Sequence, residues 1–190
     1  MKHEDFLNYY GLEKYLFNEV SKKFAEAKTI SAFDFFCIVI WKANRSKSKI
    51  AKRLLKRGEN LDEAVCFLMK AISSENDMKN RLRVIIYDWK FRLPMASAIL
   101  TVLFPTDFTI YDVRVCDELN DFKDAQYKAR FDDLWNRYEK YVQSVRAAVS
   151  GDLTLRDKDR WLWGKSFASQ LENDIQNNFK RNAGNFEPEA

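Results

Sequence analysis

Apolar residues recur at helical spacing through most of this chain, and residues that break helices are few. The segment from 5 to 28 shows the pattern, with apolar side chains at Phe6, Tyr10, Leu12, Tyr15, Leu16, Val20 and Phe24. The 190 residues include only 5 glycines and 3 prolines, too few for the many turns of an all-β protein. The sequence therefore predicts an all-α fold with one sizeable core.

Helix-capping residues divide the chain into segments. We expect helices over residues 5–28, 32–44, 47–57, 61–72, 78–90, 94–104, 113–119, 129–149 and 155–175. Ser31 and Thr154 are expected N-caps, and either Asn60 or Asp62 caps the helix from 61. Gly58 is an expected C-cap. We expect residues 1–180 to form a single helical domain and the polar residues 181–190 to form a disordered tail.

Several classes of protein are excluded by what the chain lacks. No apolar run approaches the roughly 18 residues of a membrane helix, and the acidic start is unlike a signal peptide. The dispersed Cys37, Cys66 and Cys116 predict buried thiols in a cytoplasmic protein. The single histidine, His3, leaves no base for a serine or cysteine nucleophile and no His–Cys zinc site. We expect neither metal nor cofactor, so any catalysis must use carboxylates, lysines, tyrosines or arginines.

The segment 42–57 carries a concentrated positive charge. It contains eight basic residues and no acid, although the net charge of the whole chain is only +4. Like charges one helical turn apart repel each other unless an anion offsets them. Phosphate groups would do so, and a solvated basic face is the alternative interpretation.

The stretch RLPMASAILTVLFPTDFTIYDVRV, residues 92–115, contains an isolated acid, Asp112. An apolar helix begins at Pro94 and stops before Pro105, and Asp112 follows in a short loop. Asp112 is a favoured N-cap for the helix 113–119, and it is also a carboxylate fixed where chemistry can occur. The two interpretations are compatible.

The order of these segments resembles the helix-hairpin-helix DNA glycosylases, the superfamily of endonuclease III and 3-methyladenine DNA glycosylase II. RLPMASAIL followed by IYDVRVCDEL is similar to the family's hairpin and its catalytic aspartate, which matches Asp112. FCIVIWKANRSKSKIAKRL resembles the helix and turn inserted at the lesion, and LRDKDRWLWGKSF resembles the closing helix with its glycine, here Gly164. The resemblance covers residues 31–168 and implies two helical lobes with a degenerate hairpin and Asp112 at the mouth of the cleft between them.

The resemblance implies a protein that binds double-stranded DNA and excises a base with the help of Asp112. A carboxylate beside the sugar stabilises the positive charge that develops when the N-glycosidic bond breaks. The expected DNA contacts are Lys42, Asn44, Arg45, Lys49, Lys52, Lys56, Lys90 and Arg92, with Asn44 and Arg45 as the wedge. The expected base-stacking residues are Tyr111, Trp89, Trp161 and Trp163, although core packing is the alternative for each tryptophan. Asp112 is the only acid identified, so an alkylated purine is the expected substrate.

The chain also departs from the family pattern. Arg92 and Pro94 stand where the family has hairpin glycines, and Pro94 has no N–H to donate to a phosphate. Ala96 replaces the lysine of strand-cleaving relatives, so no imine chemistry is expected, and the family's iron–sulfur cysteines are missing. These departures leave two alternatives open: a catalytically inactive module that binds nucleic acid or protein, or an unrelated helical adaptor.

Overall fold

Every regular element in the described part of the chain is helical. The computed structural model describes residues 5–179 and contains no strand among them. The α-helices are α1 (Asp5–Tyr10), α2 (Leu12–Tyr15), α3 (Ser21–Ala27), α4 (Ala32–Ala43), α5 (Lys47–Leu54), α6 (Leu61–Ser73), α7 (Met78–Arg83), α8 (Leu93–Leu103), α9 (Val113–Leu119), α10 (Phe131–Ala148) and α11 (Leu155–Asn173). The predicted all-α fold is confirmed.

Short π and 3₁₀ turns join or extend these helices. The π turns are Leu16–Val20, Val84–Asp88 and Asp174–Asn178, and the 3₁₀ turns are Asn44–Ser46 and Ala125–Tyr127. No helix within residues 5–179 has the length and apolar character needed to cross a bilayer. His3 and the predicted tail, 181–190, lie outside the described residues.

The predicted N-caps form where the sequence placed them. The hydroxyl oxygens of Ser31 and Thr154 each accept a hydrogen bond from the backbone N–H three residues later, at 3.1 Å in both cases. The side chain of Asn60 caps α6 by accepting from the N–H of Glu63 at 2.9 Å. Asp62 instead accepts from the N–H of Ala32 at 2.8 Å and so ties the start of α4 to α6.

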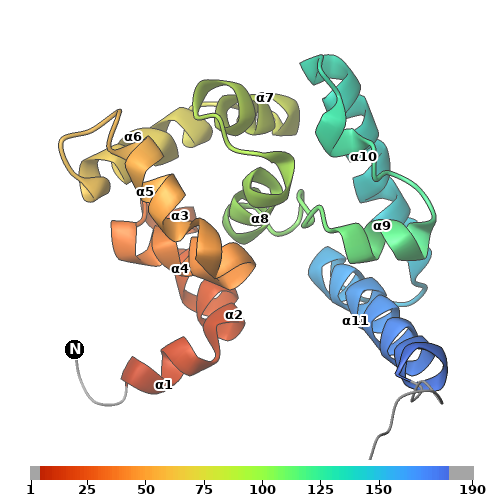
Figure 1. Ribbon diagram of the computed structural model, residues 1–190. Helices are drawn as coiled ribbons and strands as arrows, with labels where there is room; N and C mark the ends of the chain where they lie inside the picture. Colours follow the sequence, from red (N-terminus) through yellow and green to blue (C-terminus); the bar gives the residue numbers. More distant parts are fainter. Residues whose placement is uncertain (1–4, 180–190) are drawn as a thin grey trace, which may run out of the picture.

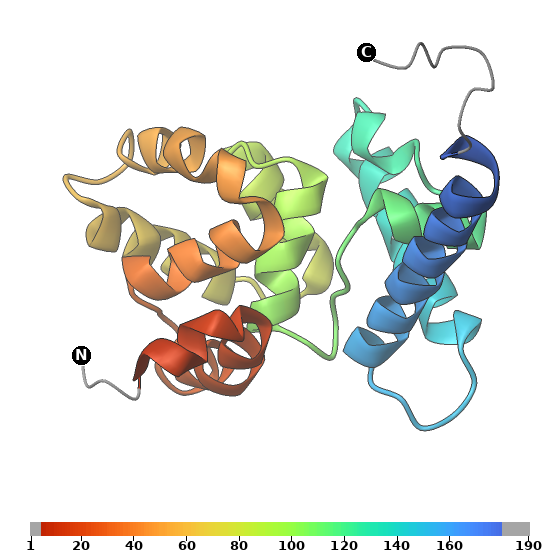
Figure 2. The same cartoon turned by 60° about the horizontal axis from the view of Figure 1, so that its bottom comes forward.

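The helices form two groups that lie side by side (Figures 1 and 2). The N-terminal bundle comprises α1–α8, and the C-terminal bundle comprises α9–α11, with α11 packed along α9 and α10. One cluster of buried apolar residues extends through both bundles. Ten of the eleven residues of helix α8, 93 and 95–103, are buried, and Pro94 is half-buried, so α8 lies at the centre of the N-terminal bundle.

An extended segment, residues 104–112, carries the chain from one bundle to the other. The buried hydroxyls of Tyr138 and Tyr141, both on α10, donate to the carbonyl oxygens of Thr109 and Ile110 at 2.6 and 2.7 Å. The N–H of Tyr111 donates to the hydroxyl of Ser97, on α8, at 2.9 Å. The segment that ends at Asp112 is therefore fixed from both sides by buried hydrogen bonds.

The expectation that Gly58 is a C-cap was wrong. Helix α5 ends at Leu54, and Gly58 does not adopt the left-handed conformation that favours glycine at a helix end. A Cβ atom at position 58 would lie 2.7 Å from the backbone nitrogen of Ala64 and 3.0 Å from its Cα. Glycine is required here because the loop after α5 passes directly over the first turn of α6.

We predict that Gly58→Ala lowers the free energy of unfolding by about 1–3 kcal/mol, because backbone atoms cannot move aside cheaply. Gly164 provides the matched control, since a Cβ there would meet nothing within 4 Å. Gly164→Ala should raise the stability of the protein by about 0.5–1 kcal/mol through higher helix propensity. Urea unfolding followed by circular dichroism measures both changes. Equal stability of the two variants would contradict the packing argument.

Candidate functional site

A pocket of about 480 Å³ lies at the junction of the two bundles. Its size falls within the roughly 300–1,000 Å³ range of ligand sites. Both bundles and the connecting segment contribute to its wall, and the lining residues are Glu13, Trp41, Lys42, Ile110, Asp112, Arg156, Asp159, Arg160 and Trp163. The wall therefore combines three carboxylates, three cations and two indole rings.

Asp112 is held at this pocket by two different interactions. As the N-cap of α9, its Oδ1 accepts a hydrogen bond from the backbone N–H of Arg114 at 3.1 Å. Its Oδ2 forms an ion pair with the Lys42 Nζ at 2.7 Å. The cap and the ion pair each hold one carboxylate oxygen in place, and 23% of the Asp112 side chain is still exposed. The predicted cap is confirmed, and the same carboxylate faces the pocket.

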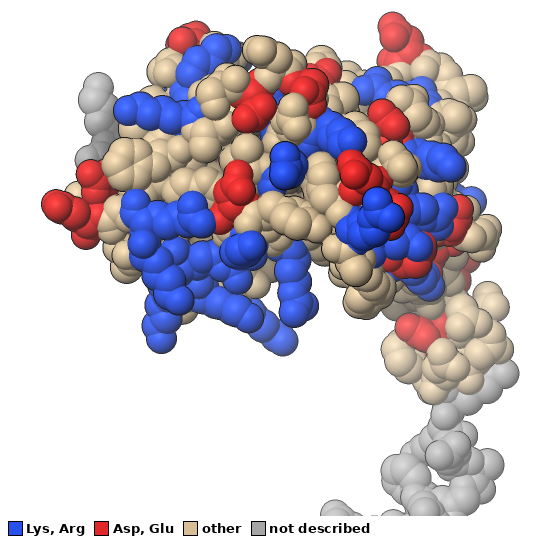
Figure 3. Space-filling model, turned by 90° about the horizontal axis from the view of Figure 1, so that it is seen from above, with Lys and Arg blue, Asp and Glu red and all other residues tan. Residues whose placement is uncertain are grey.

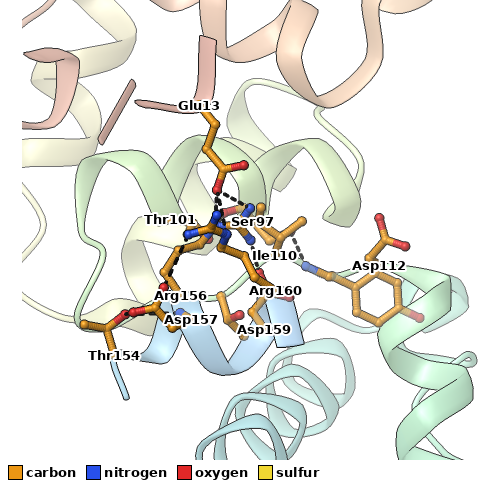
Figure 4. A network of polar contacts seen from close by, with 12 residues as sticks. Glu13, Ser97, Thr101, Ile110, Asp112, Thr154, Arg156, Asp157, Asp159 and Arg160 are labelled. Atoms are coloured by element: carbon orange, nitrogen blue, oxygen red, sulfur yellow. Dashed lines mark hydrogen bonds and ion pairs between the residues drawn. The ribbon is translucent and has the colours of Figure 1, made fainter. Parts of the chain in front are cut away.

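Arg156 joins the two bundles on another wall of the pocket. Its Nη2 lies 2.8 Å from the Oε1 of Glu13, on α2, and its guanidinium also binds Asp159 one turn further along α11. Figure 4 shows Glu13 reaching from the N-terminal bundle toward Arg156 and Arg160 on α11, with Asp112 at the start of α9. The guanidinium is 5.2 Å from the ring centre of Trp41, so an aromatic contact supports the ion pairs.

Trp163 is the predicted stacking residue that the structure brings to the pocket. Its ring is 42% exposed and lies parallel to that of Phe167, with 5.7 Å between the ring centres and 6° between the planes. The guanidinium of Arg114 is 5.3 Å from the centre of the Trp163 ring and donates to Gln170 at 2.6 Å. Arg114 thus fixes an exposed aromatic surface next to Asp112.

The other three predicted stacking residues do not line this pocket. Trp89 is only 4% exposed, and the Arg57 guanidinium lies 4.9 Å from the centre of its ring. Tyr111 is 2% exposed and donates its hydroxyl to the carbonyl of Phe122 at 2.7 Å. Trp161 is exposed and lies beside Lys165, which is also on α11. The core-packing interpretation therefore holds for Trp89, and Tyr111 is a structural residue as well.

The basic run divides into two sets of side chains. Arg53 and Arg57 lie along the surface and donate to the carbonyl oxygens of Lys90 and Asp88, in the hairpin between α7 and α8. Lys49, Lys52 and Lys56 are exposed, and none forms an ion pair with a carboxylate in the described part of the chain. Figure 3 shows the resulting positive area at the edge of the N-terminal bundle.

The remaining predicted DNA contacts are exposed and lie at two different places. Asn44 and Arg45 are exposed in the 3₁₀ turn that directly follows the pocket residues Trp41 and Lys42. Lys90 and Arg92 are exposed in the hairpin and line a separate hollow of about 440 Å³. Arg92 is also the residue before the first turn of α8. The predicted wedge residues thus lie close to the pocket, and the hairpin cations lie at a second site.

The cysteines are not part of the site. Cys37 and Cys116 are buried, Cys66 is half-buried, and all three are free thiols. Burial raises the pKa of Cys37 and that of Cys116 to about 11, so neither is a thiolate near neutral pH. The described residues contain no cluster of histidine, cysteine or carboxylate side chains that could hold a metal ion.

Sequence reasoning missed six residues of the pocket: Glu13, Trp41, Ile110, Arg156, Asp159 and Arg160. Arg156, Asp159 and Trp163 follow at intervals of three and four residues, which puts them on one face of α11. That spacing could have predicted that the three side chains share one face of a helix. The ion pair between Glu13 and Arg156 could not be predicted from the sequence, because 143 positions separate the two residues. Asp112 was the only acid identified from the sequence, and two more carboxylates, those of Glu13 and Asp159, line the pocket.

Comparisons with protein-family models, with curated proteins and with solved structures gave no match to this chain.

We predict that Tyr141→Phe lowers the free energy of unfolding by about 1–3 kcal/mol, because the buried carbonyl of Ile110 loses its hydrogen bond. Tyr127→Phe is the control, since the Tyr127 side chain is 78% exposed and its change should stay within about 0.5 kcal/mol. Thermal unfolding of both variants tests this. A Tyr141→Phe protein as stable as the parent would mean that the connecting segment does not depend on this bond.

Proposed function

We propose that this protein binds double-stranded DNA and hydrolyses the N-glycosidic bond of a base extruded into the pocket that contains Asp112. The observation that carries the proposal is the position of the Asp112 carboxylate, held at a helix N-terminus and facing a pocket between two helical bundles. The arrangement of the helices in two groups supports the proposal, because a DNA-glycosylase-like fold is expected to have two lobes.

The chemistry needs a fixed negative charge beside the sugar. Breaking the bond between C1′ and the base builds positive charge on the sugar, and a preorganised carboxylate stabilises it. The N–H of Arg114 and the ammonium of Lys42 orient both oxygens of Asp112 before any substrate arrives. Trp41 and Trp163 provide aromatic walls against which an extruded base can stack.

Binding requires positive charge near the pocket, and α5 supplies it. The exposed Lys49 and Lys52 of α5, and Lys56 just after it, form no ion pair with a carboxylate among the described residues. In the sequence, the exposed Asn44 and Arg45 lie between these lysines and the pocket residues Trp41 and Lys42. Phosphate contacts from these side chains would hold the duplex while a wedge residue enters the stack.

Excision without strand cleavage is part of the proposal. Ala96 is fully buried within α8 and carries no amine. Lys42 is the lysine at the pocket, but its ammonium is paired with Asp112, and an imine forms only from an unprotonated amine.

A catalytically inactive nucleic-acid-binding or protein-interaction module is the second candidate. The observation that favours it is that both oxygens of Asp112 already have partners, one in the cap and one in the ion pair with Lys42. A purely structural carboxylate would have the same two partners. Measurement of base release distinguishes the two candidates.

The binding prediction concerns α5. Replacing Lys49, Lys52 and Lys56 with Glu should abolish duplex binding, and each lost phosphate contact should flatten the log–log salt dependence by about 0.9. Fluorescence anisotropy with a labelled duplex measures affinity, and circular dichroism checks that the helices persist. Replacing Lys22, Lys70 and Lys140, three exposed lysines of other helices, with Glu changes the net charge equally. If both triple variants lose affinity alike, the α5 surface has no special role.

The catalytic prediction concerns Asp112. Asp112→Asn should reduce base release by about 10²–10³-fold or more while sparing affinity for DNA, because the charge matters mainly in the transition state. Asparagine is also a good N-cap, so α9 should remain folded. The assay uses duplexes with single damaged bases, followed by alkali to cut abasic sites. Asp117→Asn, on the same helix but outside the pocket, is the control. Undiminished release by Asp112→Asn would exclude this mechanism.

A further inference from the structure

Asp159 is a second, more deeply buried carboxyl group in the pocket. Only 3% of its side chain is exposed, and it lies on α11, whereas Asp112 lies at the start of α9. The guanidinium of Arg156 donates to Asp159 and holds it in place through its own ion pair with Glu13. The geometry therefore offers two carboxyl groups on different elements of one pocket wall.

The surroundings of Asp159 favour its protonated form. Burial raises the pKa of Asp159 to about 6, and the negative charge of Asp112 acts in the same direction. The positive charges of Arg156 and Lys42 oppose this increase without cancelling it.

On α10, the hydroxyls of Tyr138 and Tyr141 also face Asp159. Burial is the main cause of the raised pKa of each phenol, and the charge of Asp159 adds to it. Both phenols therefore stay neutral and do not offset the burial of Asp159.

Asp112 has different partners from those of Asp159, namely the Lys42 ammonium and the backbone N–H of Arg114. Two carboxyl groups with different partners in one pocket can divide the roles of acid and charge stabiliser. An acid with a pKa near the working pH transfers protons most effectively. Asp159 satisfies this condition for the role of acid, and Asp112 suits the role of charge stabiliser.

The need for an acid depends on the departing base. When the bond to C1′ breaks, the bonding electron pair leaves with the base. A purine alkylated at N7 already carries a positive charge and becomes neutral on departure. A neutral base becomes an anion unless a ring nitrogen or exocyclic oxygen receives a proton, so general acid catalysis accelerates its release.

We propose that Asp159 is the proton donor to a departing neutral base, so that the pocket acts on neutral damaged or mispaired bases rather than on cationic alkylated purines. The inference rests on the proposed function and specifies its substrate class. It replaces the alkylated purine expected from the sequence, where Asp112 was the only acid identified.

The proposed step balances without any further reactant. The O–H of Asp159 gives its proton to the base as the C1′–N bond breaks, and the electron pair of that bond stays on the base. Water then forms the new C1′–O bond and returns a proton to the Asp159 carboxylate. Asp112 stays charged and stabilises the sugar cation. The sum is hydrolysis, with one water consumed and one neutral base released.

The test compares two classes of single-lesion duplex with the full chain. One class carries a neutral base (uracil, hypoxanthine, 8-oxoguanine or a mispaired adenine), and the other carries 7-methylguanine. The parent protein should release a neutral base, at a rate that is constant below pH 6 and falls about tenfold per pH unit above it, because only protonated Asp159 donates. A merely structural role for Asp159 would not produce this profile.

Asp159→Asn should reduce release of the neutral base by about 10²–10⁴-fold and remove the fall above pH 6. Its release of 7-methylguanine, if the parent shows any, should change little. Asp157→Asn is the matched control, since Asp157 lies on the same helix and does not line this pocket. Unfolding curves show whether Asp159→Asn is folded at the assay temperature, and the pH profile of the parent tests the inference independently of that variant.

Four outcomes would overturn the inference. Release of 7-methylguanine alone, or neutral-base release by the parent without the fall above pH 6, removes the acid role of Asp159 and leaves the proposed function intact. Unchanged neutral-base release by a folded Asp159→Asn protein does the same. Release of no base from any of these duplexes overturns the proposed function and this inference together.

Discussion

The buried hydrogen bonds that fix the connecting segment 104–112 are the constraint on which the site depends. An extended segment in a helical protein has backbone groups that no helix satisfies, and burying them unpaired would be costly. Here Tyr138 and Tyr141 satisfy two carbonyls from α10, and Ser97 accepts from the N–H of Tyr111 on the side of α8. The segment is thereby anchored to both bundles one residue before Asp112. The same buried contacts therefore fix the position of the Asp112 carboxylate.

The charged side chains that line the pocket are paired with one another. Lys42 pairs with Asp112, Arg156 and Arg160 both pair with Glu13, and Arg156 also donates to Asp159. Each pair except Arg156 with Asp159 connects the two bundles or connects the N-terminal bundle to the start of α9. The electrostatic pairs that line the pocket are consequently the same ones that hold its walls together. Removal of one partner would leave a half-buried charge unpaired, which is more damaging than removal of an exposed ion pair.

Local features of this fold could be predicted from the sequence, and long-range pairings could not. Ser31, Thr154 and Asp112 cap their helices because capping depends on residues two or three positions apart. The burial of Trp89 depends on Arg57 and on how the hairpin folds back over α5, which no local pattern encodes. For the same reason the sequence indicated a carboxylate at position 112 but not Asp159, whose burial results from the packing of α11 against α9 and α10.

The basic run illustrates how one charge pattern supports two different tasks. Arg53 and Arg57, one helical turn apart, direct their guanidinium groups at hairpin carbonyls and stack on Phe91 and Trp89. Arginine suits this work because its planar group both donates hydrogen bonds and stacks on aromatic rings. The lysines on the other face of α5 keep their charge in solvent. The two arginines hold the hairpin against α5 and the turn that follows it, so the cations of the hairpin and those of the helix share one support.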